Sequence, residues 1–114
     1  IHGELYASNV LVDRTDDGLR VCPVDWEVAA AGPGLVDLAA LTAGWNEPDR
    51  EAIVSAYMEE DSTADADAFH RGLALCRLHL AVQWLGWSPD WRPPAEHAHD
   101  WLSEAAALAE ELAG

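Results

Sequence analysis

The sequence predicts an α+β fold that is mostly helical, with one N-terminal β-hairpin followed by about four helices. The hairpin is indicated by two short runs rich in Val and Leu, at residues 10–13 and 19–24, joined by a turn-forming link that ends at Gly18. The helices are indicated by apolar residues that recur every three or four positions after residue 34. With 114 residues, the chain has room for a single domain with a modest core.

Two helices are expected directly after the hairpin. A Gly-Pro-Gly break at residues 32–34 precedes the first, which we expect over about residues 35–41 with its end near Gly44. Asn46 is suited to cap the second helix, and Pro48 is suited to its first turn.

The third and longest helix is expected over roughly residues 65–87. Its apolar residues fall on two faces, which is typical of a central helix packed between neighbours. The first face comprises Phe69, Leu73, Cys76, Leu80, Trp84 and Trp87, and the second comprises Leu75, Leu78, Val82 and Leu85. Near the end of this helix, Trp84, Trp87 and Trp91 fit either core packing or an aromatic cage for a quaternary ammonium group.

The fourth helix is expected over about residues 95–112. We expect it to bury Trp101, Ala105, Leu108 and Leu112, with Glu104, Glu110 and Glu111 facing water. His97 and His99 are two positions apart, so on such a helix they would point about 200° from each other and could not share a metal ion.

The most informative motif lies in the first nine residues. Glu4 is followed five residues later by Asn9, which is the spacing of a kinase catalytic loop, where a carboxylate positions the acceptor hydroxyl and an amide binds Mg²⁺. Asp25 follows the second predicted strand. Because a hairpin brings its two ends together, we expect Asp25 to lie at the same end as Glu4 and Asn9.

The wider pattern resembles the aminoglycoside phosphotransferase and choline kinase-like family. It reads His-Gly-acid-x-x-x-x-Asn, a hairpin, Asp-Trp-Glu at residues 25–27, a Gly/Pro turn, and Asp-Leu-Ala at residues 37–39. The resemblance covers the C-terminal lobe of a protein-kinase-like fold. It implies a catalytic loop and metal-binding hairpin at residues 1–27, a helical subdomain at residues 33–112, and a separate N-terminal nucleotide-binding lobe that these 114 residues do not contain.

The resemblance gives roles to five residues. Glu4 stands where the family usually has Asp, the residue that orients the acceptor hydroxyl. Asn9 and Asp25 match the family's Mg²⁺ ligands, with ATP or GTP as the phosphate donor. His2 matches a structural histidine of the loop, and Asp37 matches a buried acid that supports the loop from behind.

Glu4 departs from the family pattern. Glu is one methylene longer than Asp, which moves its carboxylate by roughly 1.5 Å, and a displacement of about 1 Å can cost about a hundredfold in rate. Either the substrate site is adjusted to Glu, or this member of the family is slow or inactive.

Composition narrows the classes of partner and location. The formal net charge is −15, from 21 acids against six Arg and no Lys, which argues against nucleic acid and anionic membranes and is compatible with a cationic ligand. Neither a membrane-spanning run nor a signal peptide pattern is visible, so we expect a cytoplasmic protein. Cys22 and Cys76 lie in apolar runs and are expected to be buried free thiols.

Together, these observations predict Mg²⁺-dependent transfer of a nucleotide γ-phosphate to a hydroxyl of a small, cationic molecule that is aminoglycoside-like or choline-like. Because the chain starts with Ile and lacks the Lys that holds the phosphates, we expect it to be inactive without an upstream lobe. Two alternatives stay open, a non-catalytic lobe that acts as a binding module and a truncated gene remnant.

Overall fold

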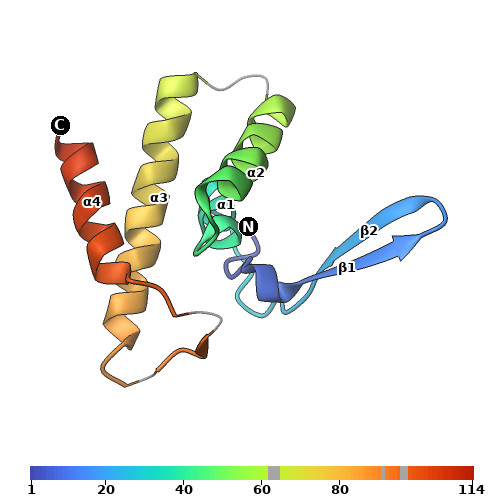
Figure 1. Ribbon diagram of the computed structural model, residues 1–114, viewed down its shortest axis with the longest axis horizontal. Coiled ribbons are helices and arrows are strands. Elements are labelled where there is room, and N and C mark those ends of the chain that lie inside the picture. Colours follow the sequence, from blue (N-terminus) through green and yellow to red (C-terminus); the bar gives the residue numbers. More distant parts are fainter. Residues whose placement is uncertain (62–64, 91, 96–97) are drawn as a thin grey trace.

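In a computed structural model of the chain, a body of helices carries one projecting β-hairpin (Figure 1). The structure describes residues 1–61, 65–90, 92–95 and 98–114. The elements are, in order, the short 3-10 helix η1 (Ala7–Asn9), strands β1 (Val10–Thr15) and β2 (Gly18–Pro23), and helices α1 (Leu35–Thr42), α2 (Glu47–Glu60), α3 (Ala66–Trp87) and α4 (Trp101–Ala113). The predicted α+β, mostly helical class is confirmed, with four helices and one two-stranded sheet in the described residues.

The hairpin is antiparallel, and Gly18 allows its turn to close. Val10 lies opposite Pro23, and Thr15 lies opposite Gly18, whose φ of 123° is one that L side chains rarely adopt. The Thr15 hydroxyl donates to the Gly18 carbonyl at 3.0 Å. The apolar side chains along the two strands stay mostly in solvent, and those more than half exposed are Leu11, Val12, Leu19 and Val21.

Side-chain caps begin α2 and α3 close to the predicted positions. The Asn46 amide oxygen accepts from the backbone N–H of Asp49 at 3.0 Å at the start of α2. The Asp65 carboxylate accepts from the backbone N–H of Asp67 at 3.0 Å at the start of α3. Both contacts satisfy backbone donors that the first turn of a helix leaves without partners.

The core has two parts along α3, which lies between α1 and α4 (Figure 1). The first cluster joins α1, α2 and α3 and comprises Leu38, Ala39, Val54, Phe69 and Leu73. The second comprises Ala40, Leu80 and Trp84, with Tyr6, Ala43 and Trp101 packed against it. Since Tyr6 belongs to the segment that precedes the hairpin, the second cluster joins that segment to α3 and α4.

The second apolar face predicted for α3 is only partly covered. Leu75 and Val82 are 51% and 57% exposed, because the helices packed on α3 do not reach these two side chains. The prediction that this face is buried is therefore wrong for both residues. A repeat of apolar residues gives the phase of a face on a helix but not whether a neighbour covers it.

Helix α4 begins at Trp101, six residues later than predicted. The Asp100 side chain caps it, with one carboxylate oxygen accepting from the Ser103 backbone N–H at 3.0 Å and the other from the Ser103 hydroxyl at 2.7 Å. His99 therefore precedes the helix and is not part of it, although the prediction placed it there. Trp91, Glu96 and His97 lie outside the described residues.

Two further expectations concern the thiols and the membrane. Cys22 and Cys76 are both free, but Cys22 is exposed because its strand projects from the helical body, so the prediction of a buried thiol is wrong there. Cys76 is half-buried, and burial raises the pKa of its thiol. Among the described residues, no helix combines the length and the apolar character needed to span a bilayer.

Candidate functional site

The segment before η1 is attached to the first turn of α1 by one carboxylate. Asp37 accepts from the backbone N–H of His2 at 2.7 Å with one oxygen and from that of Gly3 at 2.9 Å with the other. Gly3 has a φ of 92°, and a Cβ there would lie 2.8 Å from the carbonyl oxygen of Val28. Only glycine fits this position without a shift of the backbone, so the sequence His-Gly and Asp37 together fix the path of the loop.

His2 connects the same loop to the end of the hairpin. Its side chain is almost wholly buried, and its Nε2 lies 2.8 Å from the carbonyl oxygen of Val24. The backbone N–H of Glu4 donates to His2 Nδ1 at 3.3 Å. The two contacts fit one neutral tautomer, with the proton on Nε2.

The Trp26 ring packs against the ring of this histidine. The two rings lie 4.5 Å apart between centroids, and the indole N–H donates to the Pro23 carbonyl at 3.0 Å. Trp26 is nevertheless 55% exposed. It follows β2 in the sequence and belongs to neither core cluster.

Asn9 joins the loop to both ends of the hairpin. Its side-chain N–H donates to the backbone carbonyl of Glu4 at 2.9 Å, and its backbone carbonyl accepts from the Val24 N–H at 2.8 Å. With the amide nitrogen engaged in this way, the amide oxygen accepts no hydrogen bond within the described part of the chain. Val24 is hydrogen-bonded to both His2 and Asn9. It thus connects the loop to Asp25, the residue that follows Val24 in the sequence.

Asp25 has an unusual backbone for a residue with a side chain. Its φ of 64° is in the left-handed region, and it is the single non-glycine residue with a positive φ in the described ranges. Asp tolerates this region better than most residues, but the conformation is sparsely populated and concentrates at functional sites. The exposed Asp25 carboxylate makes no hydrogen bond or ion pair with any described residue.

Glu4 lines a cavity of about 480 Å³, which we call the Glu4 cavity. Its other lining residues are Tyr6, Trp84, Gly86, Trp87 and Asp90. The Tyr6 and Trp87 rings each approach Trp84 edge-on, with centroids 5.6 Å apart in both pairs. The residues that line the cavity therefore include three aromatic and two acidic ones, a combination that suits an organic cation. Asp25 does not line it.

Tyr6 stands between the loop and the helices with its hydroxyl protonated. Burial raises the pKa of Tyr6 to about 12, and the negative charge of Glu4 acts in the same direction, while a hydrogen bond with Trp84 opposes the rise. Tyr6 is therefore a neutral wall of the cavity at neutral pH.

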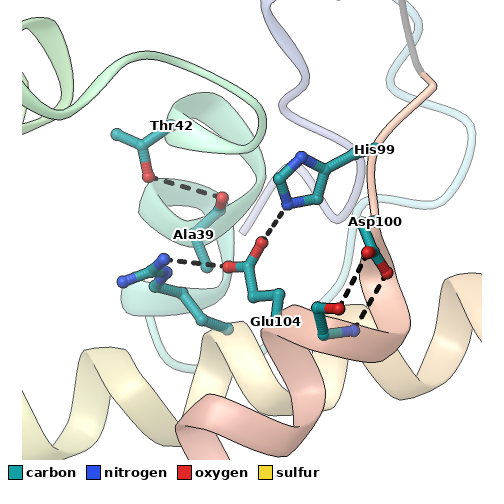
Figure 2. Close-up of polar contacts among 7 residues, drawn as sticks. Ala39, Thr42, His99, Asp100 and Glu104 are labelled. Atoms are coloured by element: carbon teal, nitrogen blue, oxygen red, sulfur yellow. Dashed lines mark hydrogen bonds and ion pairs between the residues drawn. The ribbon is translucent and has the colours of Figure 1, made fainter.

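Sequence reasoning missed a polar cluster behind this region (Figure 2). Glu104 of α4 accepts from Arg77 of α3 at 2.9 Å and also contacts His99 Nε2. Glu104 was expected to face water, but its side chain is only 16% exposed, so that expectation is wrong. Arg77 and Glu104 are separated by 27 residues in the sequence, and no local pattern indicates that their side chains meet.

Four of the predicted site residues are linked by hydrogen bonds, namely His2, Glu4, Asn9 and Asp37. The fifth, Asp25, directly follows Val24, which is hydrogen-bonded to both His2 and Asn9. Within the described residues, no group of three or more His, Cys, Asp or Glu side chains is arranged to hold a metal ion. The Asn9 amide oxygen and the Asp25 carboxylate are oxygen atoms of these predicted residues that make no hydrogen bond with a described residue.

Comparisons with known proteins add one match. A family model described as the phosphotransferase enzyme family matches residues 1–73, which include the loop, the hairpin, α1, α2 and the start of α3. No curated protein and no solved structure matches the chain.

Proposed function

We propose, from the premise that this chain belongs to the phosphotransferase enzyme family, that the protein transfers the γ-phosphate of ATP or GTP to a hydroxyl group of a small organic cation. The observation that carries the proposal is the bonded loop, in which Asn9 holds the backbone of Glu4 on one side and the strand that leads to Asp25 on the other. The proposal includes a nucleotide-binding lobe outside these residues and a cytoplasmic location.

Glu4 is the residue proposed to act on the acceptor. Glu4 lines a cavity large enough for a small organic molecule, where its carboxylate would accept the proton of the attacking hydroxyl group and orient its oxygen. The hydrogen bond from the Glu4 N–H to His2 and the bond from Asn9 to the Glu4 carbonyl hold its backbone on both sides. Positioning of this kind is the main contribution a protein makes to phosphoryl transfer.

Asn9 and Asp25 each have side-chain oxygen atoms that make no hydrogen bond with a described residue and are chemically suited to bind a magnesium ion. The amide orientation of Asn9 leaves its oxygen available, and the carboxylate of Asp25 is uncommitted to any described residue. Hard oxygen ligands of this kind are those that Mg²⁺ prefers. When bound, Mg²⁺ would supply positive charge against the phosphate oxygens of the nucleotide.

The Glu4 cavity supports a cationic acceptor. Its lining includes three aromatic residues, a residue type whose π faces attract cations, and two acidic residues, Glu4 and Asp90. The formal net charge of −15 acts in the same direction by attracting cations to the surface. Aminoglycoside-like and choline-like molecules are both within this proposal.

The test compares two acids at opposite ends of the hairpin. In the protein with its nucleotide-binding lobe, we expect Asp25→Asn to lower phosphoryl transfer at least a hundredfold, because it removes the charged ligand while keeping a side chain that tolerates the left-handed backbone. Asp16→Asn, at the exposed turn, is the control and should leave the rate within twofold. Equal rates in the two variants would contradict the proposal and favour the non-catalytic binding module.

A further inference from the structure

A small cavity with walls from all four helices shares no lining residue with the Glu4 cavity. Its volume of about 180 Å³ is below the range of about 300–1,000 Å³ typical of drug-sized ligands, so it suits a molecule with few atoms. Most of its wall is polar, and the polar lining residues are Thr42, Arg50, Glu51, His70, Arg77 and Glu111. We call it the Arg50 cavity.

The spacing of the lining residues along α3 and α4 explains how they converge. On α3 they are His70, Leu73, Ala74 and Arg77, which is the spacing of a single helical face. Helix α4 runs antiparallel to α3 (Figure 1), and Arg77 contacts Glu104. Glu111 follows Glu104 by about two helical turns, and His70 precedes Arg77 by the same interval. Both helices therefore bring these residues to one cavity.

Three charged side chains of the Arg50 cavity are uncommitted. Arg50, Glu51 and Glu111 make no side-chain hydrogen bond or ion pair with any residue that the structure describes. Arg77, by contrast, already pairs with Glu104 at 2.9 Å. The lining thus includes one positive and two negative side chains that lack partners among the described residues.

The uncommitted charges come from different sides of the cavity. Arg50 and Glu51 belong to α2 and Glu111 belongs to α4, while α3 lies between these two helices (Figure 1). The lining also includes Val54 and Leu73, which are almost completely buried. A ligand in this cavity would therefore have a positive partner on one side, a negative partner on the other, and apolar neighbours.

We propose that the Arg50 cavity binds a small zwitterion, whose carboxylate pairs with Arg50 and whose ammonium group pairs with Glu111. A simple anion would meet two carboxylates, and a simple cation would leave Arg50 without a partner. A zwitterion has no net charge, so the formal net charge of −15 does not repel it. Because the two partners come from different helices, we expect a ligand whose charged groups are several bonds apart.

γ-Aminobutyrate is a suitable probe, because its carboxylate and ammonium group lie at opposite ends of the molecule. In a nuclear magnetic resonance titration of the intact protein at constant ionic strength, it should shift the ring signals of His70 saturably, since His70 lines the cavity. The isomer 2-aminobutyrate, with both groups on one carbon, should bind about three- to tenfold more weakly. Butyrate and butylammonium, which each keep one charge, should also bind more weakly by about this factor.

Four variants show whether the two proposed partners act locally. Arg50→Gln and Glu111→Gln should each weaken the binding of γ-aminobutyrate about three- to tenfold. Arg71→Gln and Glu110→Gln are the matched controls, because each removes the same charge from an exposed residue outside the cavity lining. The controls should leave the affinity within about twofold, since their charges are screened from the cavity by solvent and salt.

Three results would overturn the proposal. The first is a set of His70 ring signals that γ-aminobutyrate does not move at tens of millimolar. The second is equal affinity for butylammonium, because Arg50 would then contribute nothing. The third is unchanged affinity in folded Arg50→Gln and Glu111→Gln proteins. If either variant fails to fold, the ligand series on the parent protein decides, and neither test depends on phosphoryl transfer.

Discussion

The hairpin and the helical body have similar apolar side chains in opposite environments. In the body, Phe69 and Leu73 are almost completely buried in a cluster shared by three helices. On the hairpin, Val12 and Val21 face each other across the strands and remain mostly exposed. In Figure 1 the hairpin points away from the helices, so its tip is distant from both core clusters.

The difference shows that the two regions are held by different forces. Burial of apolar area stabilises the body, whereas hydrogen bonds at the base of the hairpin fix its orientation, through His2, Asn9 and Asp37. The proposed catalytic residues lie at this base. Their geometry should therefore be sensitive to polar substitutions that hardly change the core.

The largest difference in stability is expected between a core and a hairpin substitution. Phe69→Ala should lower the free energy of unfolding by about 3–5 kcal/mol, because it opens a cavity in the first core cluster. Val12→Ala, at an exposed strand position, should lower it by about 0.5 kcal/mol or less. Urea denaturation followed by circular dichroism measures both, and similar losses would mean that the hairpin packs against something in solution.

A smaller effect, on rate alone, is expected from shortening Glu4. If the acceptor site is adjusted to the longer side chain, Glu4→Asp should reduce phosphoryl transfer about a hundredfold by withdrawing the carboxylate, with stability unchanged. A faster Glu4→Asp enzyme would show instead that the natural residue slows the reaction. Steady-state kinetics on both proteins, with the same acceptor, distinguishes these outcomes.

The next largest effect is expected from removing the Asp37 carboxylate, which accepts two hydrogen bonds at the base of the hairpin. Asp37→Ala leaves the His2 and Gly3 N–H groups without their partner and should cost about 1–3 kcal/mol of stability. Asp37→Asn keeps one acceptor oxygen and should cost less. Amide hydrogen exchange should accelerate at these two residues in Asp37→Ala, and protection equal to that of the parent protein would contradict the role of Asp37.

The last predicted effect is confined to alkaline pH. Because the folded pKa of Tyr6 is raised to about 12, the folded protein holds this proton more tightly than the unfolded chain, whose phenol titrates near 10.0. This contribution to stability is complete below pH 10 and is lost as the pH rises toward 12. Tyr6→Phe should flatten that decline in a series of urea titrations, and an equal slope in both proteins would contradict the shift.

Much of the fold could be predicted, because its signals are local. The hairpin was indicated by two apolar runs around Gly18, the start of α2 was indicated by Asn46, and α3 was indicated by its apolar repeat. The start of α4 was missed because Asp100 was interpreted as an interior residue. A polar residue within an apolar repeat is compatible with either a helix interior or a cap, and only the contact with Ser103 decides.

The same distinction applies to the site, where some features are local in the sequence and others depend on distant residues. The spacing of Glu4 and Asn9 lies within one short loop and was visible in the sequence, whereas the left-handed backbone of Asp25 depends on how β2 leaves the sheet. The stacking of Trp84 on Trp101 and the meeting of Arg77 with Glu104 join distant residues. No periodicity within one helix predicts such contacts, because they depend on how two helices pack.

The central claim, that the base of the hairpin holds a divalent cation, is tested most directly with Mn²⁺ as a paramagnetic stand-in for Mg²⁺. Nuclear magnetic resonance relaxation should broaden the Asn9 side-chain amide and the Val24 backbone signal at Mn²⁺ concentrations that spare Gly18 at the tip. Asp25→Asn should remove this broadening, and Asp16→Asn should preserve it. Equal broadening at tip and base, or broadening at the base that survives Asp25→Asn, would contradict the account.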